Sequence, residues 1–180
     1  MVTLKQLKLA LIVSLSVISF NSVAQMSAGV DLGILKSTED NAEALFGGEL
    51  YFKYDVTETI RAGVNLGYYQ TSDDFGTIKT TSSLMPISVL GEYLFLEDKF
   101  RPYVGLHVGL LRAGFKAGNS STSDSYFSLA PVAGIEYGIT DALGINANFK
   151  YGFAFYENGL TGETENYSTV SPNVGVFYRF

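Results

Sequence analysis

The dominant pattern in this chain is an alternation of apolar and polar positions with a period of two residues, the side-chain period of a β-strand. The alternation recurs in separate runs bounded by clusters of polar and turn-forming residues, so we predict antiparallel strands joined in chain order. The eight runs cover residues 27–35, 44–54, 59–70, 83–96, 100–112, 126–139, 142–156 and 168–180.

The connections between these runs alternate between short and long. Tight turns are predicted around 55–58, 97–99 and 140–141. Longer connections, rich in Ser, Thr, Gly, Asp and Glu, are predicted over 36–43, 71–82, 113–125 and 157–167. Short turns at one end and long loops at the other are typical of a transmembrane β-barrel.

The two faces of the predicted strands differ sharply in polarity. The face that carries Val176, Tyr178 and Phe180 is apolar in every strand, and Arg112 shares its parity only at the outer rim. A charge on a lipid-facing strand costs about 2–4 kcal/mol at the bilayer midplane, and lipid does not tolerate an open sheet edge. We therefore predict an all-β fold: an eight-stranded antiparallel up-and-down transmembrane β-barrel with its apolar face outward.

The opposite face carries most of the strand glycines and a set of charged side chains, for which we predict an ion network inside the barrel. An eight-stranded barrel has an interior only just wide enough for side chains, and unpaired charges in such a space are costly. Glu92 and Glu136 are the expected partners of Arg61, Lys150 and Arg179. The alternative is a wet lumen in which each charge is hydrated separately. The predicted interior residues are Asp31, Glu49, Lys53, Arg61, Glu92, Arg101, His107, Glu136, Lys150 and Arg179.

The N-terminus has the features of a secretory signal. Lys5 and Lys8 precede an apolar segment over 9–20, and Ser22 and Ala24 are the small residues that signal peptidase requires. We predict a cleaved signal peptide over 1–24 and a barrel domain over 25–180.

Composition narrows the chemistry. The chain has no Cys, so disulfides and thiolate sites are excluded. Removal of the signal leaves 10 Lys and Arg against 18 Asp and Glu, a net charge of −8 that argues against a nucleic-acid partner. We predict no catalytic residue, no cofactor and no metal site.

Three prolines lie well inside predicted strands, away from their first residues, and each removes a ladder donor there. Pro86, Pro131 and Pro172 all fall in the part of a strand that descends from a long connection. We predict that they mark bulges or missing ladder bonds near the outer rim.

Residues 100–109 read Phe-Arg-Pro-Tyr-Val-Gly-Leu-His-Val-Gly, which resembles the PYVGxGxG strand of the OmpA/OmpX-like outer-membrane β-barrel family. The terminal aromatic residues Tyr178 and Phe180 resemble the assembly signal of that family. The resemblance implies an integral protein of the outer membrane in the Gram-negative cell envelope, with extracellular loops and periplasmic termini. It also implies delivery by periplasmic chaperones and insertion by the barrel-assembly machinery. The expected partners are outer-membrane lipids and lipopolysaccharide, and we expect a monomer.

The chain stops at the eighth strand, so the peptidoglycan-binding domain of full-length OmpA is not expected. The favoured function is a non-enzymatic barrel whose surface-exposed loops contribute to envelope integrity or surface binding. The alternatives are a narrow gated pore and a lipid A-modifying barrel enzyme. Such an enzyme needs a His with a Ser and a carboxylate in reach. The one His of the chain, His107, has only Gly105 and Gly109 as neighbours on its own strand face, and we interpret it as an interior residue.

Overall fold

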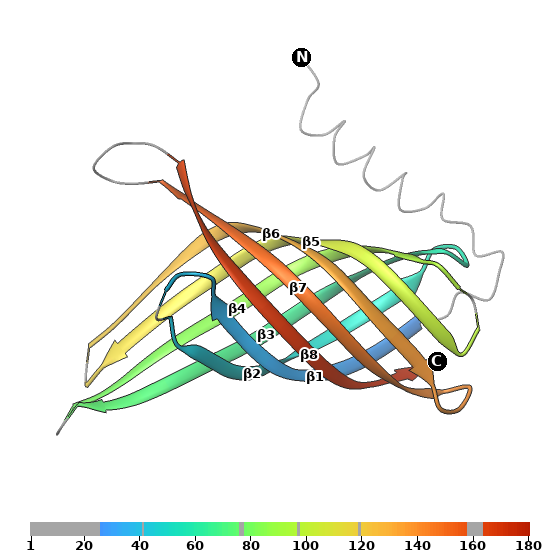
Figure 1. The fold of residues 1–180 in the computed structure, drawn as a ribbon, viewed down its shortest axis with the longest axis horizontal. Coiled ribbons are helices and arrows are strands. Elements are labelled where there is room, and N and C mark those ends of the chain that lie inside the picture. Colours follow the sequence, from blue (N-terminus) through green and yellow to red (C-terminus); the bar gives the residue numbers. More distant parts are fainter. Residues whose placement is uncertain (1–25, 41, 76–77, 97, 119, 158–163) are drawn as a thin grey trace, which may run out of the picture.

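In the computed structural model, eight antiparallel strands form a closed barrel in which each strand pairs with its neighbours in chain order (Figure 1). The eighth strand returns to the first, with Val176 opposite Val30. The strands are β1 (Met26–Ser37), β2 (Ala44–Asp55), β3 (Ile60–Phe75), β4 (Ile78–Leu94), β5 (Phe100–Ala117), β6 (Ser120–Gly138), β7 (Leu143–Glu157) and β8 (Thr164–Arg179). This architecture confirms the predicted fold class.

The structure describes residues 26–40, 42–75, 78–96, 98–118, 120–157 and 164–180. The predicted signal peptide over 1–24 lies outside the described residues. Within the described part of the chain, no helix is long and apolar enough to cross a membrane.

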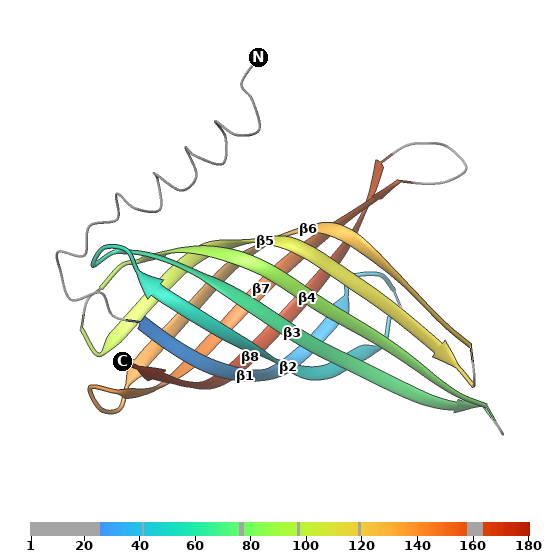
Figure 2. The same ribbon diagram turned by 180° about the vertical axis from the view of Figure 1, so that it is seen from behind.

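The last residue of the chain is held in the barrel wall. The backbone N–H of Phe180 donates to the carbonyl of Met26 at 2.8 Å, and Tyr178 lies opposite Ala28. Figure 2 shows the C-terminus and the beginning of β1 at the same end of the barrel. The connections β2–β3, β4–β5 and β6–β7 lie at this end, which we call the turn end; the opposite end is the loop end.

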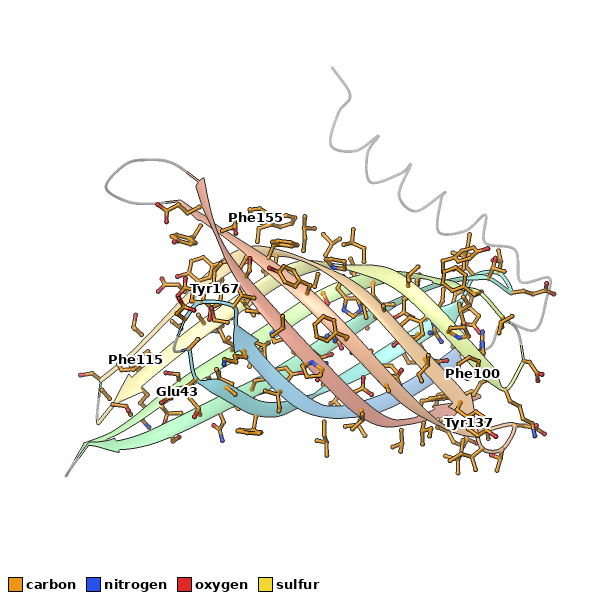
Figure 3. The ribbon with its side chains drawn as sticks, in the orientation of Figure 1. Glu43, Phe100, Phe115, Tyr137, Phe155 and Tyr167 are labelled. Atoms are coloured by element: carbon orange, nitrogen blue, oxygen red, sulfur yellow. The ribbon has the colours of Figure 1, made fainter. Side chains whose placement is uncertain are left out.

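The side of each strand that was predicted to be apolar faces outward. Leu32 is 66% exposed and Val176 is 53% exposed, whereas the inward-facing Arg61 and Glu136 are each only 1% exposed. An apolar outer surface around a polar interior is the arrangement that a bilayer requires. Aromatic side chains gather at both ends, as Phe100 and Tyr137 at the turn end and Phe155 at the loop end illustrate (Figure 3).

Two of the tight turns have the same hydrogen-bonding pattern. In the first, the N–H of Thr57 donates to the carbonyl of Ile60 at 3.0 Å, and Thr57 Oγ1 accepts from the N–H of Ile60 at 2.9 Å. In the third, Thr140 and Leu143 repeat both bonds at 3.0 and 2.9 Å. A Thr hydroxyl at this position satisfies backbone groups that the ladder leaves free.

Only one of the four predicted long connections is a loop of the predicted extent. β1 ends at Ser37 and β2 begins at Ala44, close to the predicted 36–43. The loop boundaries 71–82, 113–125 and 157–167 were wrong, because β3 to β8 continue into these segments as paired strands. Their Ser and Thr residues indicated loops, but Thr also favours strands, and the ladder that starts in the barrel wall simply continues beyond it.

The longest of these extensions is the β5–β6 hairpin, which is paired up to Ala117 and Ser120. Gly118 has a φ of 57° in the two-residue connection. Two-residue hairpin turns of the favoured types need a positive φ, which glycine adopts without steric cost. The extensions of β3 to β6 carry the sheet past the ends of β2 and β7 (Figure 1).

Pro86, Pro131 and Pro172 each interrupt a ladder on one side without changing its register. Around Pro86, the paired positions stop at Leu66–Ile87 and resume at Tyr69–Leu84 with the same offset. Equivalent gaps flank Pro131 on the side of β7 and Pro172 on the side of β1. The prediction of missing ladder bonds therefore holds, whereas no bulge forms at these prolines, because a bulge would add a residue to one strand.

Candidate functional site

The interior of the barrel holds the charged side chains, and nearly all of them are buried. Nine of the ten predicted interior residues are at most 7% exposed, and the side chain of Arg179 is 17% exposed at the turn end. The structure brings most of these residues into direct contact, in two groups at different heights along the lumen.

The group nearer the turn end is centred on Arg61. Its Nη2 lies 2.6 Å from Glu92 Oε2, and its Nη1 lies 2.8 Å from Glu136 Oε1. The guanidinium therefore bridges two carboxylates from β4 and β6, and its planar fork suits such bidentate contacts. Arg179 approaches Glu136 only to 3.9 Å.

Lys53 shares both of these carboxylates. Its Nζ lies 3.1 Å from Glu92 Oε1 and 3.5 Å from Glu136 Oε1. The same ammonium lies 4.5 Å from the ring centroid of Tyr51 and 4.8 Å from that of Tyr103. Each of the two bases, Arg61 and Lys53, therefore contacts both carboxylates, and Lys53 also contacts two aromatic rings. No charge in this group is buried without a partner.

Asp55 belongs to this group, although the sequence placed it in a tight turn. Its Oδ2 accepts from Arg101 Nη2 at 3.1 Å, and its Oδ1 lies 4.0 Å from Arg61 Nε. Counting Asp55 balances the interior at five acids and five bases. The acids are Asp31, Glu49, Asp55, Glu92 and Glu136, and the bases are Lys53, Arg61, Arg101, Lys150 and Arg179.

The second group lies nearer the loop end and corrects one predicted pairing. Lys150 forms its ion pair with Glu49 and not with Glu92 or Glu136. Glu49 Oε1 also lies 2.9 Å from Tyr69 Oη. The pairing was wrong because register and barrel closure, and not the strand face alone, decide which inward residues share a height.

Asp31 differs from the other interior acids that the structure describes, because side-chain amides hold it. Its carboxylate accepts from Asn146 Nδ2 at 3.1 and 2.9 Å and from Asn148 Nδ2 at 2.7 Å. Among the described residues, no cation lies within 4.0 Å of it. These amide N–H groups replace part of the hydration that the carboxylate loses on burial.

Large aromatic side chains fill much of the remaining interior, and the sequence analysis missed them. The rings of Tyr51 and Tyr103 lie over glycines of the neighbouring strand, because a Cβ on Gly29 or Gly134 would lie only 2.4 or 2.5 Å from them. The inward position of Tyr51 could have been predicted from the period of two, because Tyr51 shares a strand face with Glu49 and Lys53. Inward glycines therefore provide the space that the rings occupy.

An apolar plug closes the interior towards the loop end. It consists of Leu35, Leu45, Leu84, Leu111 and Ala154 around the ring of Tyr69. Tyr167 packs against this plug, and Figure 3 shows it at the loop end together with Phe115 and Glu43. Below the plug, an interior cavity lined by residues that include Tyr51, His107 and Lys150 measures about 10 Å³, roughly the space of one water molecule.

His107 contacts a hydroxyl and a carboxylate that the sequence did not place beside it. Its Nδ1 lies 3.5 Å from Ser88 Oγ, and its Nε2 lies 3.9 Å from Glu92 Oε1. These are the residue types of a Ser–His–acid triad. However, both distances are at or beyond the limit of a hydrogen bond, and the cavity beside them is too small for a substrate.

The predicted assembly residues lie on the outer surface at the turn end. Tyr178 is 47% exposed and Phe180 is 66% exposed, and their rings pack edge to face with centroids 5.0 Å apart. In the described part of the chain, no cluster of three or more His, Asp or Glu side chains is arranged to hold a metal ion.

A closed barrel with an apolar outer surface and an ion-paired interior defines an integral outer-membrane β-barrel protein. The family model described as outer membrane protein beta-barrel domain matches residues 7–180, and the chain belongs to this family. No curated protein matches the sequence.

Solved structures with the same fold come from several bacteria. Neisserial surface protein A is 17% identical with a TM-score of 0.66, over 88% of this chain and 98% of that chain. Ail, the attachment invasion locus protein of Yersinia pestis, is 17% identical with a TM-score of 0.63, over 88% of this chain and all of that chain. OprG from Pseudomonas aeruginosa is 12% identical with a TM-score of 0.55, over 91% of this chain and 98% of that chain. At these identities the likeness shows the fold.

Proposed function

We propose that this protein is a non-enzymatic outer-membrane barrel with a closed lumen, whose hairpins at the loop end contribute to envelope integrity or bind partners at the cell surface. The observation that carries the proposal is the filled interior. The ion groups, the inward aromatic rings and the apolar plug occupy the lumen in succession, and the cavity among the interior charges measures only about 10 Å³.

A planar-bilayer measurement on the refolded protein tests the closed lumen directly. We expect no steady conductance, because an ion crossing the barrel would have to displace the plug around Leu84 and Leu111 and separate the contacts of Arg61. A large, steady conductance in the unmutated protein would refute the closed lumen and favour the pore alternative.

The enzymatic alternative has one observation in its favour, the approach of Ser88 and Glu92 to His107. An assay for lipid A modification compares the unmutated protein with Ser88→Ala. Activity that disappears in Ser88→Ala would overturn the non-enzymatic assignment. We expect neither protein to modify lipid A, since the contacts of His107 are at or beyond hydrogen-bond length and the cavity beside it has room for about one water molecule.

The orientation that we propose places the loop end outside the cell and both mature termini in the periplasm. The hairpins at the loop end extend further than the turns at the other end, because β3 to β6 continue past the ends of β2 and β7. This difference supports the orientation, since short turns are typical of the periplasmic side. In the same proposal, periplasmic chaperones deliver the chain, and the barrel-assembly machinery recognises Tyr178 and Phe180 and inserts the barrel. The mature protein is a monomer in contact with outer-membrane lipids and lipopolysaccharide.

The chemistry of the loop end argues against one ligand class. A solved structure of Ail is described as a complex with the heparin analogue sucrose octasulfate. In this chain, the segments 36–43, 71–82, 113–125 and 157–167 carry three Lys against nine Asp and Glu, a net −6. We therefore do not extend binding of a sulfated polyanion to this protein, and we expect soluble surface partners to be neutral or cationic.

A further inference from the structure

Among the described residues of the loop end, β5 carries two exposed cations, Arg112 and Lys116, and β1 carries one, Lys36. The connections β1–β2 and β7–β8 carry one base, Lys36, against six acids. The extensions of β3 to β6 carry three bases and three acids. Along the sequence, the acids of those two connections are Glu39, Asp40, Glu43, Glu157, Glu163 and Glu165, and the segments of β3 to β6 carry Asp73, Asp74 and Asp124 with Lys79, Arg112 and Lys116.

Arg112 and Lys116 lie on the outward face of β5, directly above its lipid-facing residues. They continue the alternation of Leu106 and Leu110, which are 44% and 50% exposed. One two-residue step along a strand is about 7 Å, so Arg112 is the first position beyond the last apolar one. Both cations are exposed. In the barrel that we propose, they reach the level of the lipid headgroups.

Hydroxyl groups flank Lys116 on both sides and Arg112 on the side of β6, whereas Met85 lies opposite Arg112 on β4. Across the ladder, Lys116 lies between Thr81 of β4 and Ser121 of β6, and Arg112 lies opposite Ser125. Arg112 Nη2 donates to Ser123 Oγ at 2.9 Å, which holds the guanidinium against the sheet and leaves its other donors available. The outward side chains described beside them on β4 and β6 are uncharged.

An apolar groove lies on the same outer face below the cations. It measures about 550 Å³, and its lining includes Leu66, Ile87 and Val108. Val108 precedes Arg112 on β5, and Ile87 lies opposite Leu110. The groove extends over the outer face from β2 to β5, and the cations lie on β5 at its loop-end side. A cationic position above an apolar groove matches an amphiphile with an anionic head and acyl chains.

We propose that Arg112 and Lys116 bind the phosphate group of a phosphorylated glycolipid of the outer leaflet, while its acyl chains follow the outer face of β4 and β5. This inference rests on the proposed orientation. Arg and Lys are the common side chains for phosphate, one as a planar fork and the other as a point charge, and the neighbouring hydroxyls supply further donors. The β1–β2 connection, with Glu39, Asp40 and Glu43, would repel the same headgroup.

Binding to the refolded protein in detergent micelles tests the site. The probes are diphosphorylated lipid A and the same lipid A stripped of its phosphates, titrated with EDTA present so that divalent cations cannot bridge acids to phosphate. A cation at the membrane surface contributes roughly a fivefold change in binding. We expect Arg112→Gln with Lys116→Gln to weaken binding of the phosphorylated lipid by about 30-fold.

Lys36→Gln with Lys99→Gln is the matched control, since it removes two exposed bases elsewhere, one near the loop end and one at the turn end. We expect binding to change less than about twofold, and the stripped lipid to bind equally weakly to both variants. The exchange Arg112→Lys with Lys116→Arg keeps both charges and is expected to keep binding, which separates loss of charge from misfolding.

Equal binding by the unmutated protein and the Arg112→Gln, Lys116→Gln variant would overturn the site. The micelle measurement does not depend on orientation, so that result would leave the proposed orientation intact. Conversely, antibody labelling of the turn end on intact cells would refute the orientation even if lipid A still bound to the two cations.

Discussion

Replacement of Glu136 by Gln tests whether the interior charges act as dry, paired groups. The change keeps nearly the same volume and removes one negative charge from the centre of the Arg61 group. Arg61 and Lys53 would then share Glu92, at 2.6 and 3.1 Å. The interior would change from a balance of five acids and five bases to an excess of one positive charge.

The expected loss of stability follows from the burial of the group. Glu136 is 1% exposed and touches Arg61 at 2.8 Å, and removal of one partner of such a buried pair costs about 3–5 kcal/mol. We expect Glu136→Ala to lie in that range. Glu136→Gln should lose about 2–3 kcal/mol, because its amide oxygen still accepts a hydrogen bond.

The free energy of unfolding is measured by denaturant titration of the protein in lipid vesicles, followed by gel mobility of the folded and unfolded forms. Glu58→Gln is the matched control, since Glu58 is exposed in the first tight turn, and it should change stability by less than about 0.5 kcal/mol. A loss for Glu136→Gln no larger than this control would show that the lumen is wet and that its charges are hydrated one by one.

The remaining predictions concern topology, assembly and interior packing. An epitope tag beside Asp40 should be reachable by antibody on intact cells and a tag at Asp98 should not; the reverse result would invert the orientation. Phe180→Ser should lower the amount of folded barrel in the outer membrane, because Phe180 is 66% exposed beside Tyr178 at the membrane edge; normal outer-membrane levels with unchanged heat-modifiable mobility would remove its assembly role. Gly134→Val should destabilise the barrel by about 1–3 kcal/mol, since its Cβ would meet the ring of Tyr103 at 2.5 Å. Adding Tyr103→Ala should remove that clash, so a double variant with the full sum of both losses would contradict the interlocked packing.

The sequence by itself determined the strands and the direction of each side chain. A period of two assigns every residue of a strand to one face, and a bilayer tolerates charges on only one of them. The outward position of Leu32 and the inward position of Arg61 were therefore readable without a structure. The ends of the strands were not, because Ser and Thr serve loops and paired extensions equally well.

Only the tertiary structure decided which interior residues meet. Lys150 and Glu49 are 101 residues apart, and their contact depends on the stagger of the intervening strands and on the closure of β8 against β1. Asp55 joins the network because the end of β2 still points into the lumen, whereas its place next to a turn suggested solvent. The face on which a side chain lies depends only on its position within its own strand, so the sequence of that strand is enough to predict it. The height of a side chain in the lumen depends on the register of every pair of neighbouring strands around the barrel. No single segment of the sequence encodes that height.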